Sequence, residues 1–416
     1  AILLVLLVAV LLRLGNISGS GHTLTSDELD YLQLAEQLRN GQTYATQDGP
    51  TAYRPPAYPF FVAGLLTLVS SLTFIFVIQI LLELLVCILL YKIGTSIAGS
   101  SVGFTAMGVW ALFPSSVIMP GLLMSETLFT AVLTGMMTMH ISERRRPLLL
   151  GALLGISILL KPQMMLIGGV YGVRIVMQHR WKDAVMIAGM AGVLITPWIV
   201  RNAAMMDAAV LTTNGGINFW IGNNPEANGG YHVPSSPLLD SGATEKEVNN
   251  EGYRQGLSFI LNEPAASVVL AGKKLAYLWS SQMYLLLTAD DGINMERPYR
   301  EQLREIPFRS ALSVDIPYLL LVLFGLAGLF LLPEGKPVFT SAVIGLTVLW
   351  CIVHVLYFGA ARFVYPILPM LAVTAAIGVQ ERHRIITLPM RSRLILSIIA
   401  TLFLLLFVLQ YVLIYR

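Results

Sequence analysis

Long runs of apolar residues recur along almost the whole chain, and they limit the folds that it can adopt. A helix of about 20 apolar residues crosses the hydrocarbon core of a bilayer, because its backbone polar groups are all bonded within the helix. The sequence therefore predicts an all-α polytopic membrane protein with about 11–13 transmembrane helices. Apolar runs of spanning or near-spanning length lie at about 73–93, 101–119, 121–141, 147–160, 162–178, 183–200, 314–332, 338–358, 363–379 and 394–414.

The composition agrees with a lipid environment. Of the 416 residues, 56% are hydrophobic and only 12% are charged, against about 25% charged residues in a soluble domain. The net charge of +3 is too small to indicate a nucleic-acid partner. The opening AILLVLLVAVLLRLG is short for a span and is interpreted as a first helix whose start lies before residue 1.

The positions of Lys and Arg predict the direction of each crossing, because cationic loops stay on the cytoplasmic side. Three connections are strongly cationic: 142–147, 178–183 and 381–393. Placing them inside gives about eleven spans, provided that the run at 57–70 does not cross. That run has about 14 residues, a length typical of re-entrant or interfacial helices, so we expect it to lie at the outer surface.

Two polar segments then lie on the same outer face. The first is 15–57, and the second is 201–312, in which residues 262–287 are predicted to form one amphipathic helix in the interface. The chain is accordingly divided into three parts. They are an N-terminal transmembrane module at 1–200 that contains the first outer loop at 15–57, an outer-face region at 201–312 with an interfacial helix, and C-terminal transmembrane helices at 313–416.

Acidic and basic residues converge on this face. A charged side chain beside a bilayer is costly in free energy, so such residues are candidates for a functional role. Cations there can hold a phosphate, and a carboxylate can take a proton from an incoming hydroxyl or amine. For any single residue the bland alternatives remain open: helix-end Lys and Arg snorkel to the interface, and Glu126 suits the first turn of its helix. The charged residues concerned are Asp27, Glu28, Asp30, Glu126, Lys161, Arg201 and Arg362.

Several motifs resemble those of the GT-C superfamily of membrane glycosyltransferases, in particular the branch of aminoarabinose transferases and protein O-mannosyltransferase relatives. The most specific likeness is the first-loop pair Asp27-Glu28 with Tyr31, followed by TAYRPPAYPFF. The other motifs follow in the same order along essentially the whole chain. They are LLMSETLFT, ILLKPQMM, TPWIVRN, GGINFWIGNNPEANGGY and ARFVYPILPM.

The resemblance implies a GT-C fold and transfer of a sugar, with inversion, from a polyprenyl-phosphate-linked donor. It makes Asp27 the general base, with Glu28 as the neighbouring acid and alternative base. Adjacent residues on a helix point about 100° apart, so only one of the two can face the cavity, and their spacing does not tell which one. Glu126 matches the family's second-loop acid. The implied phosphate-binding residues are Lys161, Arg362, Arg54 and Arg201, and the implied substrate-contacting residues are Tyr31, Tyr58, Asn218, Trp220, Asn223 and Asn224.

The same resemblance leaves other matters open. No metal site is assigned, although Mg²⁺ or Ca²⁺ between Asp27 and Glu126 is possible chemistry for oxygen ligands. The expected partners are the lipid donor, the bilayer and a glycan, lipid or protein acceptor, in a bacterial inner membrane with the site at the outer face. A lipid-linked-sugar transporter or flippase is the alternative, but it would place polar groups at mid-membrane. Residues 215–231 could equally form a turn region over the cavity.

Overall fold

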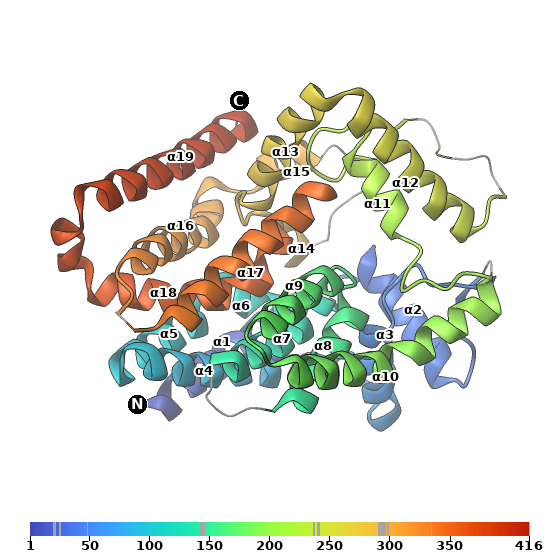
Figure 1. The fold of residues 1–416 in the computed structure, drawn as a ribbon, viewed down its shortest axis with the longest axis horizontal. Helices are drawn as coiled ribbons and strands as arrows, with labels where there is room; N and C mark the ends of the chain where they lie inside the picture. Colours follow the sequence, from blue (N-terminus) through green and yellow to red (C-terminus); the bar gives the residue numbers. More distant parts are fainter. Residues whose placement is uncertain are drawn as a thin grey trace.

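A computed structural model gives the fold of residues 1–19, 22–24, 26–47, 49–141, 146–235, 238, 242–289, 297, 299–333 and 335–415. Most of these residues are helical (Figure 1). Within the described part of the chain, the strands are two short ones, β1 (Ala45–Thr46) and β2 (Gly49–Pro50). They pair antiparallel, with Ala45 opposite Pro50. Of the cationic connection 142–147, residues 142–145 lie outside the described residues.

Seven helices among the described residues are long and apolar enough to cross a membrane, which makes this an integral membrane protein. An eighth is obtained if α5 (Ser100–Leu112) and the following α6 (Pro114–Ile118) with η1 (Met119–Gly121), bent by 62°, count as one span. The seven are α1 (Ile2–Gly19), α4 (Leu72–Ala98), α10 (Trp181–Met206), α16 (Phe308–Phe330), α17 (Pro337–Leu356), η2 (Ala361–Ile367) continued by α18 (Leu368–Gln380), and α19 (Met390–Tyr415).

The remaining apolar runs also form helices, but these are shorter than a full span. They are α3 (Ala57–Leu68), α7 (Ser125–Ile141), α8 (Pro147–Leu160) and α9 (Met164–Met177). At 14 residues, α8 and α9 are each about 21 Å long, less than the hydrocarbon thickness of about 30 Å. The expected eleven to thirteen spans therefore include helices that do not reach across a bilayer alone. The run at 57–70, expected not to cross, is the 12-residue helix α3.

The polar segments carry helices that gather on one side of the molecule. In Figure 1, α11 (Gly215–Gly222), α12 (Glu245–Asn262) and α13 (Pro264–Leu278) lie together, with α2 (Asp27–Arg39) and α3 near α11. The single helix expected at 262–287 is two helices, α13 and α14 (Tyr284–Ala289). Two further short helices are α15 (Tyr299–Glu305) and η3 (Arg382–Thr387).

A carboxylate inside the helical core is satisfied by two buried hydrogen-bond donors, as burial of a charged group requires. The fully buried Glu83 of α4 accepts hydrogen bonds from Trp110 Nε1 at 2.8 Å and from the Tyr365 hydroxyl at 2.6 Å. Nearby, α4 and α5 approach closely because each has a glycine at the contact, Gly94 in α4 and Gly103 in α5. A Cβ on Gly94 would lie 2.7 Å from the Cα of Gly103. Small residues allow such helix contacts in membranes.

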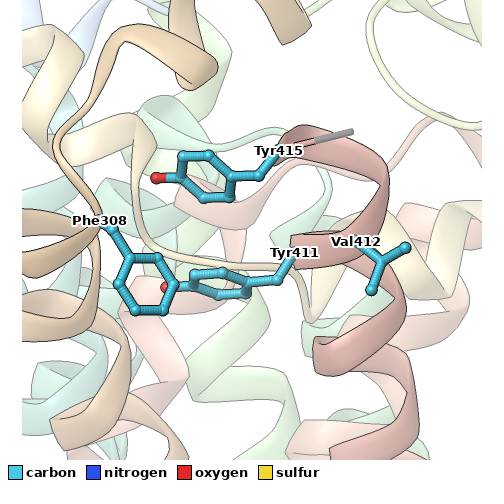
Figure 2. Close-up of a pocket in the computed structure, with 4 residues that line it drawn as sticks. All are labelled: Phe308, Tyr411, Val412 and Tyr415. Atoms are coloured by element: carbon cyan, nitrogen blue, oxygen red, sulfur yellow. The ribbon is translucent and has the colours of Figure 1, made fainter.

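An open hollow lies between the start of α16 and the end of α19 (Figure 2). Tyr411 and Tyr415 project from successive turns of α19 toward Phe308, and the two tyrosine rings stack with centroids 5.9 Å apart. Both hydroxyls are used within the protein, by Asp315 and by the Ile306 carbonyl. This cluster therefore packs the end of α19 in the manner of an aromatic belt at a membrane interface.

Candidate active site

The acidic helix α2 presents two carboxylates in one direction. Its first turn contains Asp27, Glu28 and Asp30, a placement that the helix dipole favours. Residues three apart lie on the same helix face, so Asp27 and Asp30 point the same way while Glu28 turns elsewhere. The structure thereby separates the two acids that the sequence left as alternatives.

Asp27 lies between two guanidinium groups that come from distant parts of the chain. One carboxylate oxygen is 2.6 Å from Arg54 Nη2, and the other is 2.8 Å from Arg362 Nη1. Burial raises the pKa of Asp27, but the charges of Arg362 and Arg54 outweigh burial and hold this pKa well below its usual range. Asp27 is therefore an ionised, partly buried carboxylate in a cationic setting.

Arg54 is held in place from both sides. Its Nε and Nη2 donate to one oxygen of Asp30, at 3.0 and 2.7 Å, and its guanidinium lies over the rings of Tyr31 and Tyr53. Asp30 is half exposed to solvent and at the same time orients Arg54. The i, i+3 spacing of Asp27 and Asp30 is the sequence signal that could have linked both to one cation.

A second ion pair lies beside the first. Lys161, at the end of α8, is 3.0 Å from the buried Glu126 in the first turn of α7. Arg362 interacts electrostatically with Glu126 as well as with Asp27. Acids and cations therefore alternate through one network, and its six members are Asp30, Arg54, Asp27, Arg362, Glu126 and Lys161.

Glu28 has a different set of contacts. Its side chain is buried, both oxygens lie 2.9 Å from Nε2 of His22, and one accepts the backbone N–H of Leu123 at 2.8 Å. Glu28 thus ties α2 to the segment that leads into α7 and Glu126. His22 was not singled out in the sequence, because nothing in its spacing marks it.

The segment that carries Arg54 is clamped by Arg201 and Glu245. Arg201 donates to the backbone carbonyls of Tyr44 and Thr51, and its guanidinium lies 5.0 Å from the ring centre of Trp198. Glu245, at the start of α12, accepts from the Thr51 hydroxyl at 2.6 Å and the Ala52 N–H at 3.1 Å. These contacts assign Arg201 to the loop, and its phosphate-binding role stays a prediction. Sequence reasoning missed Glu245 altogether.

The residues predicted to contact substrate fall into two groups. Tyr58 is 1% exposed, its hydroxyl is bonded to Gln79, and its ring meets that of Tyr31 edge-on. Tyr31 also lies under Arg54, and Asn218 is half-buried on α11. The structure therefore keeps Tyr31 beside the charged network but gives Tyr58 a packing role, which corrects the expectation for Tyr58.

The asparagines after α11 are committed to the protein itself. The Asn224 amide donates to the carbonyls of Trp220 and Ile221. The Asn223 amide donates to Phe219 and Leu356 and accepts from Lys274 Nζ at 2.8 Å. Because these groups are buried and used, Asn223, Asn224 and Trp220 hold the loop together, which favours the turn-region alternative for 215–231.

Lys274 lies in the segment 262–287 that was predicted to form an interfacial helix, and it is buried within the protein. Its side chain is buried and also donates to the Val355 carbonyl at 2.9 Å, so it joins α13 to the end of α17. Burial lowers the pKa of Lys274 to about 8. Lys273, its neighbour, is the exposed residue of the pair.

The described side chains do not favour a metal between Asp27 and Glu126. Each of the two carboxylates is already matched by a cationic side chain, at 2.6–2.8 Å for Asp27 and 3.0 Å for Glu126. Among the described residues, no group of three or more His, Cys, Asp or Glu side chains could hold a metal ion. A divalent cation would have to displace these partners, so no chemical step is assigned to one.

The described residues confirm the all-helical membrane fold that the sequence predicted, and this fold brings the acids and cations of the site together. No protein-family model matches the sequence, and a search of curated proteins finds no significant similarity. Solved structures do share the fold. The oligosaccharyltransferase of Archaeoglobus fulgidus in its apo form aligns with a TM-score of 0.50 and 12% identity. The alignment covers 100% of this chain and 56% of that one.

Two further structures are similar. The same oligosaccharyltransferase in complex with Zn and sulfate gives a TM-score of 0.52 at 13% identity, over 100% of this chain and 52% of that one. ArnT from Cupriavidus metallidurans bound to undecaprenyl phosphate gives 0.44 at 13%, over 92% of this chain and 79% of that one. The chain thus spans about half the length of the oligosaccharyltransferase, and identities this low establish the fold alone.

Proposed function

We propose that this protein is a glycosyltransferase that moves a sugar from a polyprenyl-phosphate-linked donor to an acceptor at the outer membrane face. The observation that carries the proposal is the position of Asp27 between Arg54 and Arg362, with the Glu126–Lys161 pair beside it. A carboxylate among cations at the level of helix ends suits a reaction on an anionic lipid. Acceptors can be glycans, lipids or proteins.

Donor binding follows from the charge balance of the network. Three acids, Asp27, Asp30 and Glu126, face three cations, Arg54, Arg362 and Lys161. A lipid phosphate that binds Arg362 and Lys161 competes with the carboxylates, because each cation has a limited number of donors. Arg362 is the more accessible of the two, with 35% of its side chain exposed. Phosphate binding at Arg362 would loosen its hold on Asp27.

That exchange also solves a problem with Asp27 as a base. A carboxylate whose pKa is held low by two arginines takes up protons poorly. Once a donor phosphate has taken Arg362, the pKa of Asp27 rises and its free oxygen can accept a proton from the acceptor hydroxyl or amine. The acceptor atom forms a bond to the anomeric carbon, and the bond from that carbon to the phosphate oxygen breaks. The electron pair leaves with the phosphate, next to Arg362 and Lys161.

The other predicted residues receive supporting roles in this mechanism. Arg54 stays bound by Asp30 and keeps Asp27 ionised until donor arrives. Glu28 fixes α2 against the Leu123 segment, and Arg201 fixes the Thr51 loop. Tyr31, buried beneath Arg54, borders the network, and Asn218, half-buried on α11, stays a predicted substrate contact.

The outer face is supported by the length and direction of α10. This helix begins at Trp181, next to the cationic connection 178–183, and carries Arg201 in its last turns. Its 26 residues cover about 39 Å, enough to separate the two ends by a bilayer. If the cationic end is cytoplasmic, the site lies outside.

A transporter of lipid-linked sugars is the alternative, and no observation favours it. Charged residues within spans, such as Glu83 and Arg13, are fully buried and bonded to neighbouring groups. A transport path needs polar groups that line a mid-membrane cavity.

Purified protein incubated with a panel of radiolabelled polyprenyl-phosphate sugars tests the proposal. We expect one donor to be consumed, with label passed to an acceptor fraction. Translocation of an intact donor across vesicles without any consumption would instead support transport and overturn the proposal.

A further inference from the structure

A narrow apolar groove lies between α7, α8, α9 and α17, outside the charged network. Its walls are mostly methionine and leucine side chains, including Leu133, Met137, Leu154, Met164 and Leu346. Gly345 of α17 leaves room in this wall, because a Cβ at this position would meet no atom within 4 Å. The groove is therefore suited to a hydrocarbon chain.

One end of the groove is polar and cationic. Arg174, His140, Tyr171 and Ser341 line it, with His140 Nδ1 2.9 Å from the Tyr171 hydroxyl and Arg174 Nη2 donating to Ser341 Oγ at 2.8 Å. Among the described residues, no carboxylate forms an ion pair with Arg174, and Asp183 is paired with Arg180. Arg174 and Arg180 both add positive potential at His140.

This end is separated from the Asp27 network by the length of α9. Lys161 precedes α9, and Arg174 lies in its last turn. From Met164 to Arg174 the helix has eleven residues and covers about 15 Å, half of the hydrocarbon thickness. The next helix, α10, starts at Trp181 and carries Arg201, which bonds the Thr51 loop beside the charged network, and its 26 residues cover about 39 Å. The two cationic positions therefore belong to opposite leaflets.

We propose that this groove binds one acyl chain of an anionic phospholipid from the leaflet opposite the Asp27–Arg362 site. Its phosphate would lie on Arg174, with the one N–H or O–H hydrogen that the His140–Tyr171 bond leaves over as a further donor. An arginine fork matches phosphate geometry, and basic pockets between transmembrane helices are known to take anionic headgroups. A zwitterionic lipid gains less, because its ammonium group adds positive charge next to Arg174. The site is independent of the proposed donor site.

The test uses the full chain, delipidated in detergent and titrated with phosphatidylglycerol or phosphatidylcholine. Binding is followed by native mass spectrometry and by the melting temperature. We expect phosphatidylglycerol to bind at least about tenfold more tightly than phosphatidylcholine and to raise Tm, since both lipids carry the phosphate but only phosphatidylcholine brings an ammonium group next to Arg174.

Two matched pairs of variants assign the binding to the groove. Gly345→Leu fills the groove and Gly169→Leu, an exposed glycine of α9 with equally open surroundings, does not. Arg174→Gln removes the headgroup cation, and Arg382→Gln removes an exposed arginine elsewhere. We expect preferential phosphatidylglycerol binding to be lost in the first member of each pair and retained in the second.

Several outcomes would overturn the inference. Equal binding of the two lipids, or unchanged phosphatidylglycerol binding in both Gly345→Leu and Arg174→Gln, would exclude the site. Polyprenyl phosphate could displace phosphatidylglycerol and raise Tm in the wild type but not in Gly345→Leu. That result would assign the groove to the donor tail instead. If Gly345→Leu fails to fold, Arg174→Gln alone decides between these results.

Discussion

The carboxylate of Asp27 lies 2.8 Å from the guanidinium of Arg362, although the two residues come from opposite ends of the chain. This pair joins the acidic helix α2 of the first polar segment to η2, which continues into the C-terminal span α18. The proposed proton acceptor and the proposed phosphate-binding cation therefore lie in contact, and this contact has consequences that can be measured.

Asp27→Asn should remove the general base without disturbing the fold. We expect turnover of the lipid-linked donor to fall by about 10²- to 10⁴-fold, the usual contribution of a positioned base. Asp30→Asn is the matched control on the same helix face, and it should lose much less because Asp27 remains. Donor consumption and thermal stability are measured on both variants. Wild-type turnover in Asp27→Asn would exclude this residue as the base.

The pH dependence should differ between free enzyme and donor complex. In the free protein the pKa of Asp27 lies below its ordinary value of 3.8, so the acidic limb of kcat/KM should fall below that pH. Donor binding takes Arg362 from Asp27 and raises the pKa, so the acidic limb of kcat should lie at higher pH. Coincident limbs would argue against the exchange of Arg362 between carboxylate and phosphate.

Arg362→Gln should weaken donor binding and change the acidity of Asp27 together. Loss of a charge-assisted phosphate contact of about 1.5–3 kcal/mol predicts a donor KM about tenfold higher or more. Without this cation the pKa of Asp27 rises, so the acidic limb of kcat/KM moves to higher pH. Arg362→Lys, which keeps the charge, should recover part of both effects. A KM and a pH profile like those of the wild type would show that Arg362 acts elsewhere.

Glu245→Gln should loosen the segment that positions Arg54. The carboxylate accepts from Thr51, Ala52 and Thr213, and an amide would turn an NH₂ group toward one or more of these donors. A buried donor left unpaired costs about 1–3 kcal/mol. We therefore expect lower thermal stability and a reduced kcat. Lys246→Gln, which breaks only an exposed pair with Asp207, is the control and should behave like wild type.

Glu83→Leu should destabilise the bundle without a direct effect on the chemistry. It leaves the Trp110 and Tyr365 donors buried and unpaired, at about 1–3 kcal/mol each. Glu83→Gln retains one acceptor oxygen and should lose less. Unfolding in detergent measures both variants. Equal stability of Glu83→Leu and wild type would mean that other groups satisfy these donors.

The sequence by itself determined the helices, because spans depend on local runs of apolar side chains. Each predicted run is helical, although the run at 101–119 is broken into α5, α6 and η1, and the short run at 57–70 became the 12-residue α3. The sequence also singled out Asp27, Arg362, Lys161 and Glu126, because charges beside a bilayer are costly and therefore conspicuous.

Only the tertiary structure decided which of these charges meet. Spacing could not distinguish Asp27 from Glu28, since that choice depends on which helix packs against each face of α2. Arg54 was matched to Asp30, and Asn223 to Lys274, by contacts between segments far apart in the chain. The apolar pattern of a sequence segment determines which helix that segment forms. Partners across the bundle are set by the order and angle of packing, which no single segment encodes.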